Sequence, residues 1–478
     1  MTTKEAFRVS VVLLFFLLLQ GDHHLFADET KPNIVLIYLD DFGWRDTGFN
    51  GSKFYETPNM DRIANEGMNF VNAYANAPNC APSRACLMSG QYSPRHGIYT
   101  VGNSDRGKSK NRKLIPVRNQ TILPASVPTL PESIQKAGYA TCFLGKWHLG
   151  EQNGTGPIGQ GFDENFGGLT WGHPKGYFSP YRNPYLKDGP KGEYLTDRLT
   201  DEAIGFIKKQ VDAKKRKPFF VCLSHYAVHT PIQAKKSITD KYSGKEPEDG
   251  QKNAKYAAMI ESVDEGIGKI FEALKAKELS ENTLVILYSD NGGYGGATDN
   301  SPLRGSKGMM YEGGIRVPLA MMWPNVIPKK SICKVPVIGT DLYPTLTEIA
   351  GGKLPDNHTL DGESIVPLMK GKSELERDAI YWHFPAYLQG KFKGARKGER
   401  FFRTRPASAI RVGDWKLIEF FEDGGLELYN LAKDVGESND LSNSETTKRD
   451  ELHRRLKEWR KSVDAPVPTK LNPDFEEK

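Results

Sequence analysis

Long apolar runs are nearly absent from this 478-residue chain, since only one occurs, between Val9 and Leu19. No later stretch reaches the ~20 residues that a bilayer-spanning helix needs, so the sequence predicts no stable membrane insertion. Cysteine is also scarce, and the odd count of five leaves at least one thiol for a separate role. The net charge of +6 is small for this length and indicates no nucleic-acid partner.

The one apolar run has the features of a secretory signal peptide. Lys4 and Arg8 precede it, and Leu25-Phe26-Ala27 ends in a small residue suited to cleavage. A membrane anchor is the alternative, but the run is short for a bilayer-spanning helix. We therefore expect residues 1–27 to be removed. The protein would be exported, either periplasmic or secreted, or lysosomal if the source is eukaryotic.

The order of predicted elements indicates an α/β fold with a smaller C-terminal domain. Apolar, β-rich runs at residues 33–39, 219–223 and 283–289 are typical of strands buried on both faces of a parallel sheet. Beyond about residue 375, short strands joined by Gly- and Lys-rich turns precede an amphipathic helix. We predict a large, mostly parallel central sheet flanked by helices in residues 28–374, and an antiparallel sheet with a helix in residues 375–478.

Acidic and amide side chains follow two of these strands at the point where each strand ends. Asp40 and Asp41 follow the first strand, and Asp290 and Asn291 follow the strand at 283–289. Ligands bind at the carboxyl ends of strands in open α/β sheets, and hard oxygen donors without His or Cys favour Ca²⁺ or Mg²⁺ over Zn²⁺. These four residues therefore predict a divalent cation site, with a solvated turn as the alternative for the first pair.

A cysteine and an arginine lie close together in the segment Cys80-Ala81-Pro82-Ser83-Arg84, between a turn and the apolar start of a helix. A cysteine at a helix N-terminus beside an arginine lies in a positive field that favours an anionic group. A buried structural thiol is the alternative. Further cationic groups occur at predicted strand or loop ends, at Lys146, His148, His229 and Lys307.

These segments together resemble the formylglycine-dependent, type I sulfatase family of the alkaline phosphatase-like superfamily, including arylsulfatases and N-acetylgalactosamine sulfatases. Residues 80–84 match the family signature Cys-x-Pro-Ser-Arg, although Ser89 stands where threonine is commoner. Gly-Lys-Trp-His, His-x-Pro and Arg-Gly-x-Lys blocks follow in the family's order. The resemblance extends from about Pro32 to Tyr429.

The resemblance implies a sulfatase that hydrolyses a sulfate ester. Cys80 would be oxidised to formylglycine (3-oxoalanine) by a maturation enzyme, and its hydrate would be the nucleophile and a ligand of one cation, Ca²⁺ rather than Mg²⁺. By the same resemblance, His148 would lie near the formylglycine and His229 near the leaving oxygen. The remaining implied catalytic or sulfate-binding residues are Arg84, Lys146 and Lys307.

The substrate is predicted less directly. The aromatic span 171–185 contains His173 and Arg182, which we expect to line a sugar subsite unless this span is a packed surface loop. The basic stretches 101–121 and 391–405 are interpreted as a rim for an anionic substrate, or as solvated loops. An exported enzyme with such loops fits a sulfated carbohydrate, of the glycosaminoglycan or algal polysaccharide type. The alternatives are a phosphatase or phosphodiesterase of the same superfamily, and a catalytically inactive protein that binds sulfated glycans.

Overall fold

The computed structural model describes residues 31–390 and 392–477. The predicted signal peptide, residues 1–27, lies outside the described residues. From Pro32 onward the chain forms one compact unit. Among the described residues, no helix combines the length and the apolar character needed to cross a bilayer.

An eight-stranded sheet forms the centre of this unit, in the strand order β5-β4-β6-β1-β7-β8-β2-β9. Strand β8 runs antiparallel to both of its neighbours, and every other pair is parallel. The prediction of a large, mostly parallel sheet is therefore confirmed. The strands are β1 (Asn33–Leu39), β2 (Met68–Phe70), β4 (Ala140–Gly145), β5 (Glu164–Phe166), β6 (Phe219–Ser224), β7 (Thr283–Ser289), β8 (Leu319–Met322) and β9 (Ser331–Cys333).

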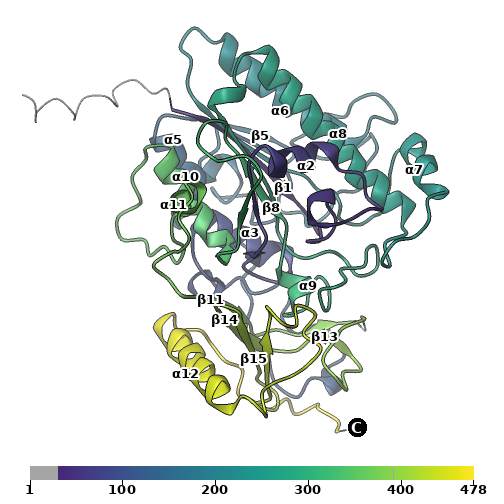
Figure 1. Ribbon diagram of the computed structural model, residues 1–478, viewed down its shortest axis with the longest axis vertical. Coiled ribbons are helices and arrows are strands. Elements are labelled where there is room, and N and C mark those ends of the chain that lie inside the picture. The colour runs from purple at the N-terminus through teal and green to yellow at the C-terminus, as the bar shows by residue number, and fades with distance from the viewer. Residues whose placement is uncertain (1–30, 391, 478) are drawn as a thin grey trace, which may run out of the picture. The chain divides into compact units, whose positions relative to one another are not determined.

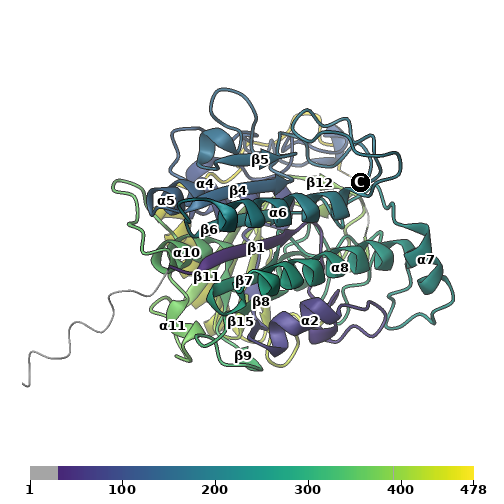
Figure 2. The ribbon, with the colours of Figure 1, turned by 90° about the horizontal axis from the view of Figure 1, so that it is seen from above.

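Helices cover both faces of the sheet, and β1 shows why its sequence is apolar throughout. Val35 and Ile37 belong to the hydrophobic cluster of one face, whereas Ile34 and Leu36 belong to the cluster of the other. Successive side chains of a strand alternate between faces, so a strand covered on both sides needs an unbroken apolar run. Figure 2 shows α6 and α8 over the first face, and Figure 1 shows α3 and α10 on the other. The helices of the first face are α2 (Pro58–Asn65), α6 (Leu195–Asp212) and α8 (Ala254–Ala276), and those of the second are α3 (Cys80–Ser89), α5 (Leu130–Lys136) and α10 (Leu342–Ile349).

The register of the central strands brings their carboxyl ends to one edge. Leu39 pairs with Ser289 across β1 and β7, and Tyr38 pairs with Ser224 across β1 and β6. Gly145 at the end of β4 also pairs with Ser224. The residues that follow β1, β4, β6 and β7 therefore meet, although they are far apart in the sequence.

The C-terminal part forms an antiparallel sheet with one helix packed on it, at the bottom of Figure 1, which confirms the predicted α+β architecture. Leu452, Leu456, Trp459 and Val463 join the cluster of this sheet. Trp382 also donates a hydrogen bond to the Ala75 carbonyl at 2.8 Å, which ties the sheet to the rest of the unit. The elements are β11 (Ala379–Phe384), β14 (Ala407–Val412), β15 (Trp415–Phe420), β16 (Leu426–Asn430) and α12 (Thr446–Ser462). The boundary between residues 374 and 375 stays a prediction.

Short elements complete the described chain. Strands β3 (Ala73–Tyr74) and β10 (Val337–Ile338) pair in parallel, and β12 (Leu388–Gln389) and β13 (Phe402–Thr404) form an antiparallel ribbon. The short helices are α4 (Ser93–His96), α7 (Lys236–Ser243), α9 (Glu312–Ile315) and α11 (Val366–Met369), with 3₁₀ turns at 48–50, 109–111, 158–160, 280–282 and 339–341.

Candidate active site

Cys80 is the first residue of α3, and its side chain lines a cavity of about 220 Å³. Only 2% of the residue is exposed. The Ser83 hydroxyl accepts a hydrogen bond from the Ala77 N–H and donates one to the Ala77 carbonyl, both at 3.0 Å, which fixes the turn before the helix. The Gly308 N–H donates to the Pro78 carbonyl at 2.6 Å, so the loop that carries Lys307 is held against this turn.

The four predicted cation ligands lie together at the sheet edge. The Asp41 N–H donates to Asp290 Oδ1 at 3.2 Å, and Asn291 Nδ2 donates to Asp41 Oδ1 at 2.9 Å. Asp41 has a φ of 61°, and His148 has a φ of 65°, a left-handed conformation that is uncommon outside glycine. Two such residues at one site mark a backbone shaped around a particular arrangement of side chains.

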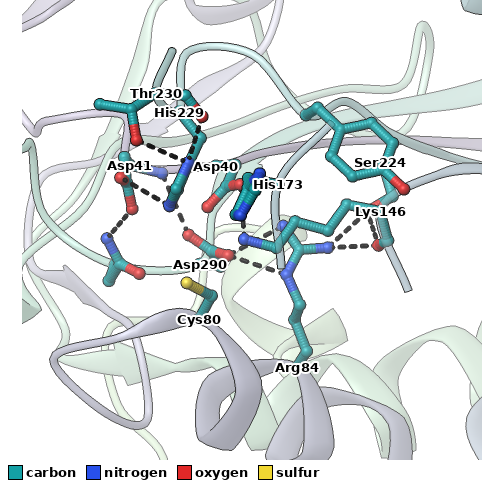
Figure 3. A network of polar contacts seen from close by, with 12 residues as sticks. Asp40, Asp41, Cys80, Arg84, Lys146, His173, Ser224, His229, Thr230 and Asp290 are labelled. Atoms are coloured by element: carbon teal, nitrogen blue, oxygen red, sulfur yellow. Dashed lines mark hydrogen bonds and ion pairs between the residues drawn. The ribbon is translucent and has the colours of Figure 1, made fainter. Parts of the chain in front are cut away.

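Three cations match the three buried carboxylates, as Figure 3 shows for two of them. Lys146 Nζ lies 2.6 Å from Asp40 Oδ2, and Lys307 Nζ lies 2.5 Å from Asp41 Oδ1. Arg84 contacts Asp290 Oδ2 through Nε and Nη2, each at 2.8 Å. Burial of an unpaired charge is strongly unfavourable, so these partners offset part of the cost of burying the acids. Burial acts to raise the pKa of all three carboxyls; Lys307 and His229 outweigh it at Asp41, whose pKa is lowered, whereas the pKa values of Asp40 and Asp290 stay raised.

Lys307 also reaches the predicted nucleophile position, with its Nζ 3.5 Å from Cys80 Sγ. Burial alone raises the pKa of the Cys80 thiol, but Lys146, Lys307 and hydrogen bonds with His148 and His229 hold it well below its usual value. The environment of position 80 therefore stabilises negative charge.

Histidines follow β4 and β6 and face the same cavity. Burial, the largest effect, lowers the pKa of His148 to about 4. Burial and Lys307 also act to lower the pKa of His229, but the carboxylates of Asp41 and Asp40 outweigh them and raise it. His229 Nε2 lies 3.6 Å from Asp41 Oδ2, and its ring stacks at 6.3 Å on that of His173. His148 is thus suited to accept a proton, whereas the carboxylates beside His229 favour its protonated form.

Arg182 is the one predicted site residue that the structure places elsewhere. It is exposed and does not line the cavity, and its backbone N–H donates to Asp188 Oδ1 at 3.2 Å. The structure brings together the other predicted residues, which are Asp40, Asp41, Cys80, Arg84, Lys146, His148, His173, His229, Asp290, Asn291 and Lys307.

Individual residues of the two basic stretches were not singled out from the sequence. The structure places Arg106 and Arg403 in the wall of the cavity, together with Gln389. The excess of basic residues in 101–121 and 391–405 was the available signal. It could not identify these two, because spacing within a loop does not determine which side chain turns inward.

The oxygen atoms at the sheet edge fit a divalent cation. Asp40 Oδ1 and Asn291 Oδ1 are buried and have no hydrogen-bond partner. Buried polar atoms in proteins nearly always have a partner, so two buried oxygens without one indicate that a ligand such as a cation binds here. Ligating atoms of Asp40, Asp41, Cys80 and His229 lie within 4.8 Å of one another. Oxygen-rich surroundings of this kind suit Ca²⁺ or Mg²⁺.

A buried cysteine at a helix start, a cluster of acids and surrounding cations lie at one edge of an α/β sheet of the alkaline phosphatase-like fold, which defines the class of protein. The chain belongs to the sulfatase family and is a sulfuric ester hydrolase, since the family described as "Sulfatase" matches residues 32–352. A second family, described as "N-sulphoglucosamine sulphohydrolase, C-terminal", matches residues 306–462. Both the resemblance and the enzyme class predicted from the sequence are confirmed.

Relatives agree with this assignment over most of the chain. A "Sulfatase" of Formosa agariphila is 34% identical and is matched over 97% of this chain and 96% of its own. The N-acetylgalactosamine-6-sulfatase of Homo sapiens is 32% identical, over 73% of this chain and 68% of its own. The crystal structure of Ps i-CgsB in complex with k-i-k-neocarrahexaose superposes with a TM-score of 0.76 at 33% identity, covering 94% of this chain and 96% of that one.

Proposed function

We propose that this protein hydrolyses sulfate esters of sulfated glycans, with formylglycine at position 80 and one Ca²⁺ ion. The observation that carries the proposal is the position of Cys80, which lies at the junction of the acid cluster and the cavity with Lys307 3.5 Å away. The glycan substrate is supported by similarity to the structure containing neocarrahexaose and to the N-acetylgalactosamine-6-sulfatases. Export and an encounter with a formylglycine-generating maturation enzyme are part of the same proposal.

Asp40, Asp41, Asp290 and Asn291 would hold the cation, beside position 80. When bound, Ca²⁺ supplies a Lewis acid that polarises a sulfate oxygen and lowers the pKa of a nearby hydroxyl. The formylglycine hydrate would supply a hydroxyl group as the nucleophile, which an unmodified cysteine thiol does not have. Mg²⁺ is the less favoured alternative, because it requires a more regular shell of ligands.

The lysines would bind the sulfate group. Lys307 lines the cavity beside position 80 and pairs with Asp41, and the fully buried Lys146 pairs with Asp40 next to it. Preformed cations in a buried site stabilise the charge that develops during transfer. Arg84 acts differently, since its guanidinium is engaged by Asp290, the Ser224 hydroxyl and the Lys146 carbonyl. Arg84 therefore positions Asp290.

The two histidines would move protons. His148 is neutral at physiological pH and would take the proton from the hydroxyl at position 80. His229, whose pKa is raised, would donate a proton to the oxygen of the departing sugar alcohol. This division rests on their different surroundings, since His229 faces Asp41 whereas His148 does not contact a carboxylate in the described structure.

The test combines mass spectrometry of the peptide containing Cys80, from native material, with release of inorganic sulfate from a panel of sulfated glycans. We expect formylglycine at position 80 and turnover that falls more than about 100-fold in Cys80→Ala. Cys333→Ala, which changes a buried cysteine outside the cavity, is the control. A converted residue without turnover on any sulfated glycan would overturn the glycan assignment. An unmodified cysteine would favour the alternative interpretation, a catalytically inactive protein that binds sulfated glycans.

A phosphatase with two zinc ions finds no support at this site. Such enzymes resemble this fold but need additional histidine ligands. Among the described residues, a single group of clustered ligating atoms was found, and it contains one histidine.

A further inference from the structure

Two arginines that the proposed mechanism does not use line the cavity around Cys80. Arg106 lies in the loop that follows α4, and Arg403 lies on β13. Both are partly buried. The cavity already holds Lys307, His148 and His229 around the nucleophile position, so these arginines add positive charge beyond what one sulfate group needs.

The two arginines are delivered by one continuous piece of structure. The Tyr387 N–H, next to β12, donates to the Ser104 carbonyl at 2.8 Å, and Asp105 forms a bridge with Tyr387. Arg112 braces the loop, because its Nη1 donates to the carbonyls of Asp105 and Gly107, both at 2.6 Å. The loop that carries Arg106 is thus fixed on the β12–β13 ribbon that carries Arg403.

Arg403 lies directly beside the sulfate-binding loop. Its Nη1 donates to the Lys307 carbonyl at 3.4 Å, and its Nε donates to the Gln389 carbonyl at 3.2 Å. A Cβ on Gly308 would lie 2.5 Å from Arg403 Cδ, so only glycine at this position lets the side chain cross the loop. Phe392 supports the guanidinium from behind, with its ring centroid 4.2 Å away.

Neither arginine has a carboxylate partner among the described residues. Arg106 donates to the Val101 carbonyl, and Arg403 donates to the two carbonyls named above. Arg405 and Arg396, from the same basic stretch, behave differently, because each forms ion pairs with two acids. Burial lowers the pKa of both cavity arginines, and Arg106 adds to that effect at Arg403 by repulsion. Both side chains line the cavity, and the described residues offer most of their N–H groups no acceptor.

We propose that Arg106 and Arg403 bind a second anionic group of the substrate, a sulfate or a carboxylate on the sugar next to the ester that is cleaved. The inference rests on the proposed function and adds to it the class of glycan, which is one that carries at least two negative charges on neighbouring sugars. Arginine suits this role because its planar fork of donors binds an oxyanion through two hydrogen bonds. The sulfate that is cleaved would be bound by Lys146 and Lys307.

The test measures binding, so it does not depend on maturation or turnover. The probes are κ-type neocarratetraose with one sulfate per disaccharide, ι-type neocarratetraose with two, and a chondroitin sulfate tetrasaccharide that adds a carboxylate. Their dissociation constants are measured by calorimetry on the full-length Cys80→Ala protein with Ca²⁺. We expect a doubly anionic probe to bind at least about tenfold more tightly than the κ-type probe, because each charge-assisted pair contributes strongly. Preference for the ι-type or the chondroitin probe identifies the second group as sulfate or carboxylate.

In Arg106→Gln and Arg403→Gln this preference should fall to about twofold or less, because a neutral amide cannot replace the ion pair. Arg118→Gln and Arg400→Gln remove exposed arginines of the same two stretches and should retain it. If the Gln variant folds poorly, Arg403→Lys replaces it in the test. This variant keeps the charge, and we expect it to retain part of the preference. Equal affinity for probes with one and two anionic groups, or an equal loss for both kinds of probe in the Gln variants, would overturn the proposal. Absence of turnover by the native protein on every glycan, with this preference intact in the Cys80→Ala protein, would instead refute the proposed function.

Discussion

Lys416 forms the centre of a buried charge network that joins β15 of the C-terminal sheet to α9, which follows the loop that carries Lys307. Its Nζ lies 3.0 Å from Glu312 Oε1 and 2.8 Å from Glu437 Oε1, and all three residues are 0% exposed. Glu437 Oε2 accepts a hydrogen bond from the Glu312 N–H at 2.6 Å, at the start of α9. The network thus holds one lysine and two carboxyl groups out of contact with water, and Arg316 Nη1 lies 3.5 Å from Glu312 Oε2 as a second cation.

Lys416→Met should destabilise the protein by about 3–5 kcal/mol, because it leaves the buried Glu437 without its cation, while Glu312 keeps Arg316. The entropy of unfolding of 478 residues is about 1 kcal/mol/K near 60 °C, so Tm should fall by about 3–5 °C. Burial already raises the pKa of Glu437 to about 7, and loss of Lys416 removes the group that opposes this rise. The destabilisation should therefore be larger at pH 8 than at pH 6, where Glu437 is more often protonated.

Thermal unfolding followed by circular dichroism measures the effect, with Lys433→Met at an exposed position as the matched control. The double variant Lys416→Met/Glu437→Gln should recover part of the lost Tm, because it removes one of the unpaired charges. A Tm for Lys416→Met within 1 °C of the control at both pH values would refute the reasoning.

Two further predictions concern the cation and the buried histidines. Asp290→Ala should weaken Ca²⁺ binding by at least about 10- to 100-fold in calorimetry and abolish most sulfate release, whereas Asp299→Ala should not; unchanged Ca²⁺ affinity and turnover would exclude the assigned site. His383 is buried between Ser408 Oγ at 2.7 Å and the Pro466 carbonyl at 3.0 Å, and burial lowers its pKa to about 3. The unfolded state, with a pKa near 6.5, then binds more protons, so stability falls as the pH drops from about 6.5 towards 3. His383→Gln should reduce the loss of unfolding free energy between pH 7 and pH 5 by about 2 kcal/mol. An identical pH dependence in chemical denaturation of the two proteins would contradict this.

The site could be predicted from the sequence where its residues follow directly from a strand or open a helix. Asp40 and Asp41 follow β1, and Asp290 and Asn291 follow β7, so recognising two buried strands was enough to bring them together. The residues whose place differs from the expectation, or that the sequence does not single out, lie in loops. Arg182 and His173 occur in one aromatic span, yet only His173 lines the cavity. A loop has no fixed period, so neighbouring side chains in it can face opposite directions.

The sequence predicts the strands and places Cys80 at a helix start and the acidic side chains at strand ends, because continuous apolar runs, a helix start and strand ends are local properties of the chain. Which basic side chains reach the cavity depends on tertiary packing. Tertiary packing also decided that Arg84 binds Asp290 and that Lys416 lies between Glu312 and Glu437. Those contacts join residues far apart in the chain. They depend on the order of strands in the central sheet and on how the C-terminal sheet packs against the rest of the unit. A buried charge needs a partner of opposite charge, and the packed fold determines which partner lies within reach. The spacing of residues along the sequence does not specify that partner.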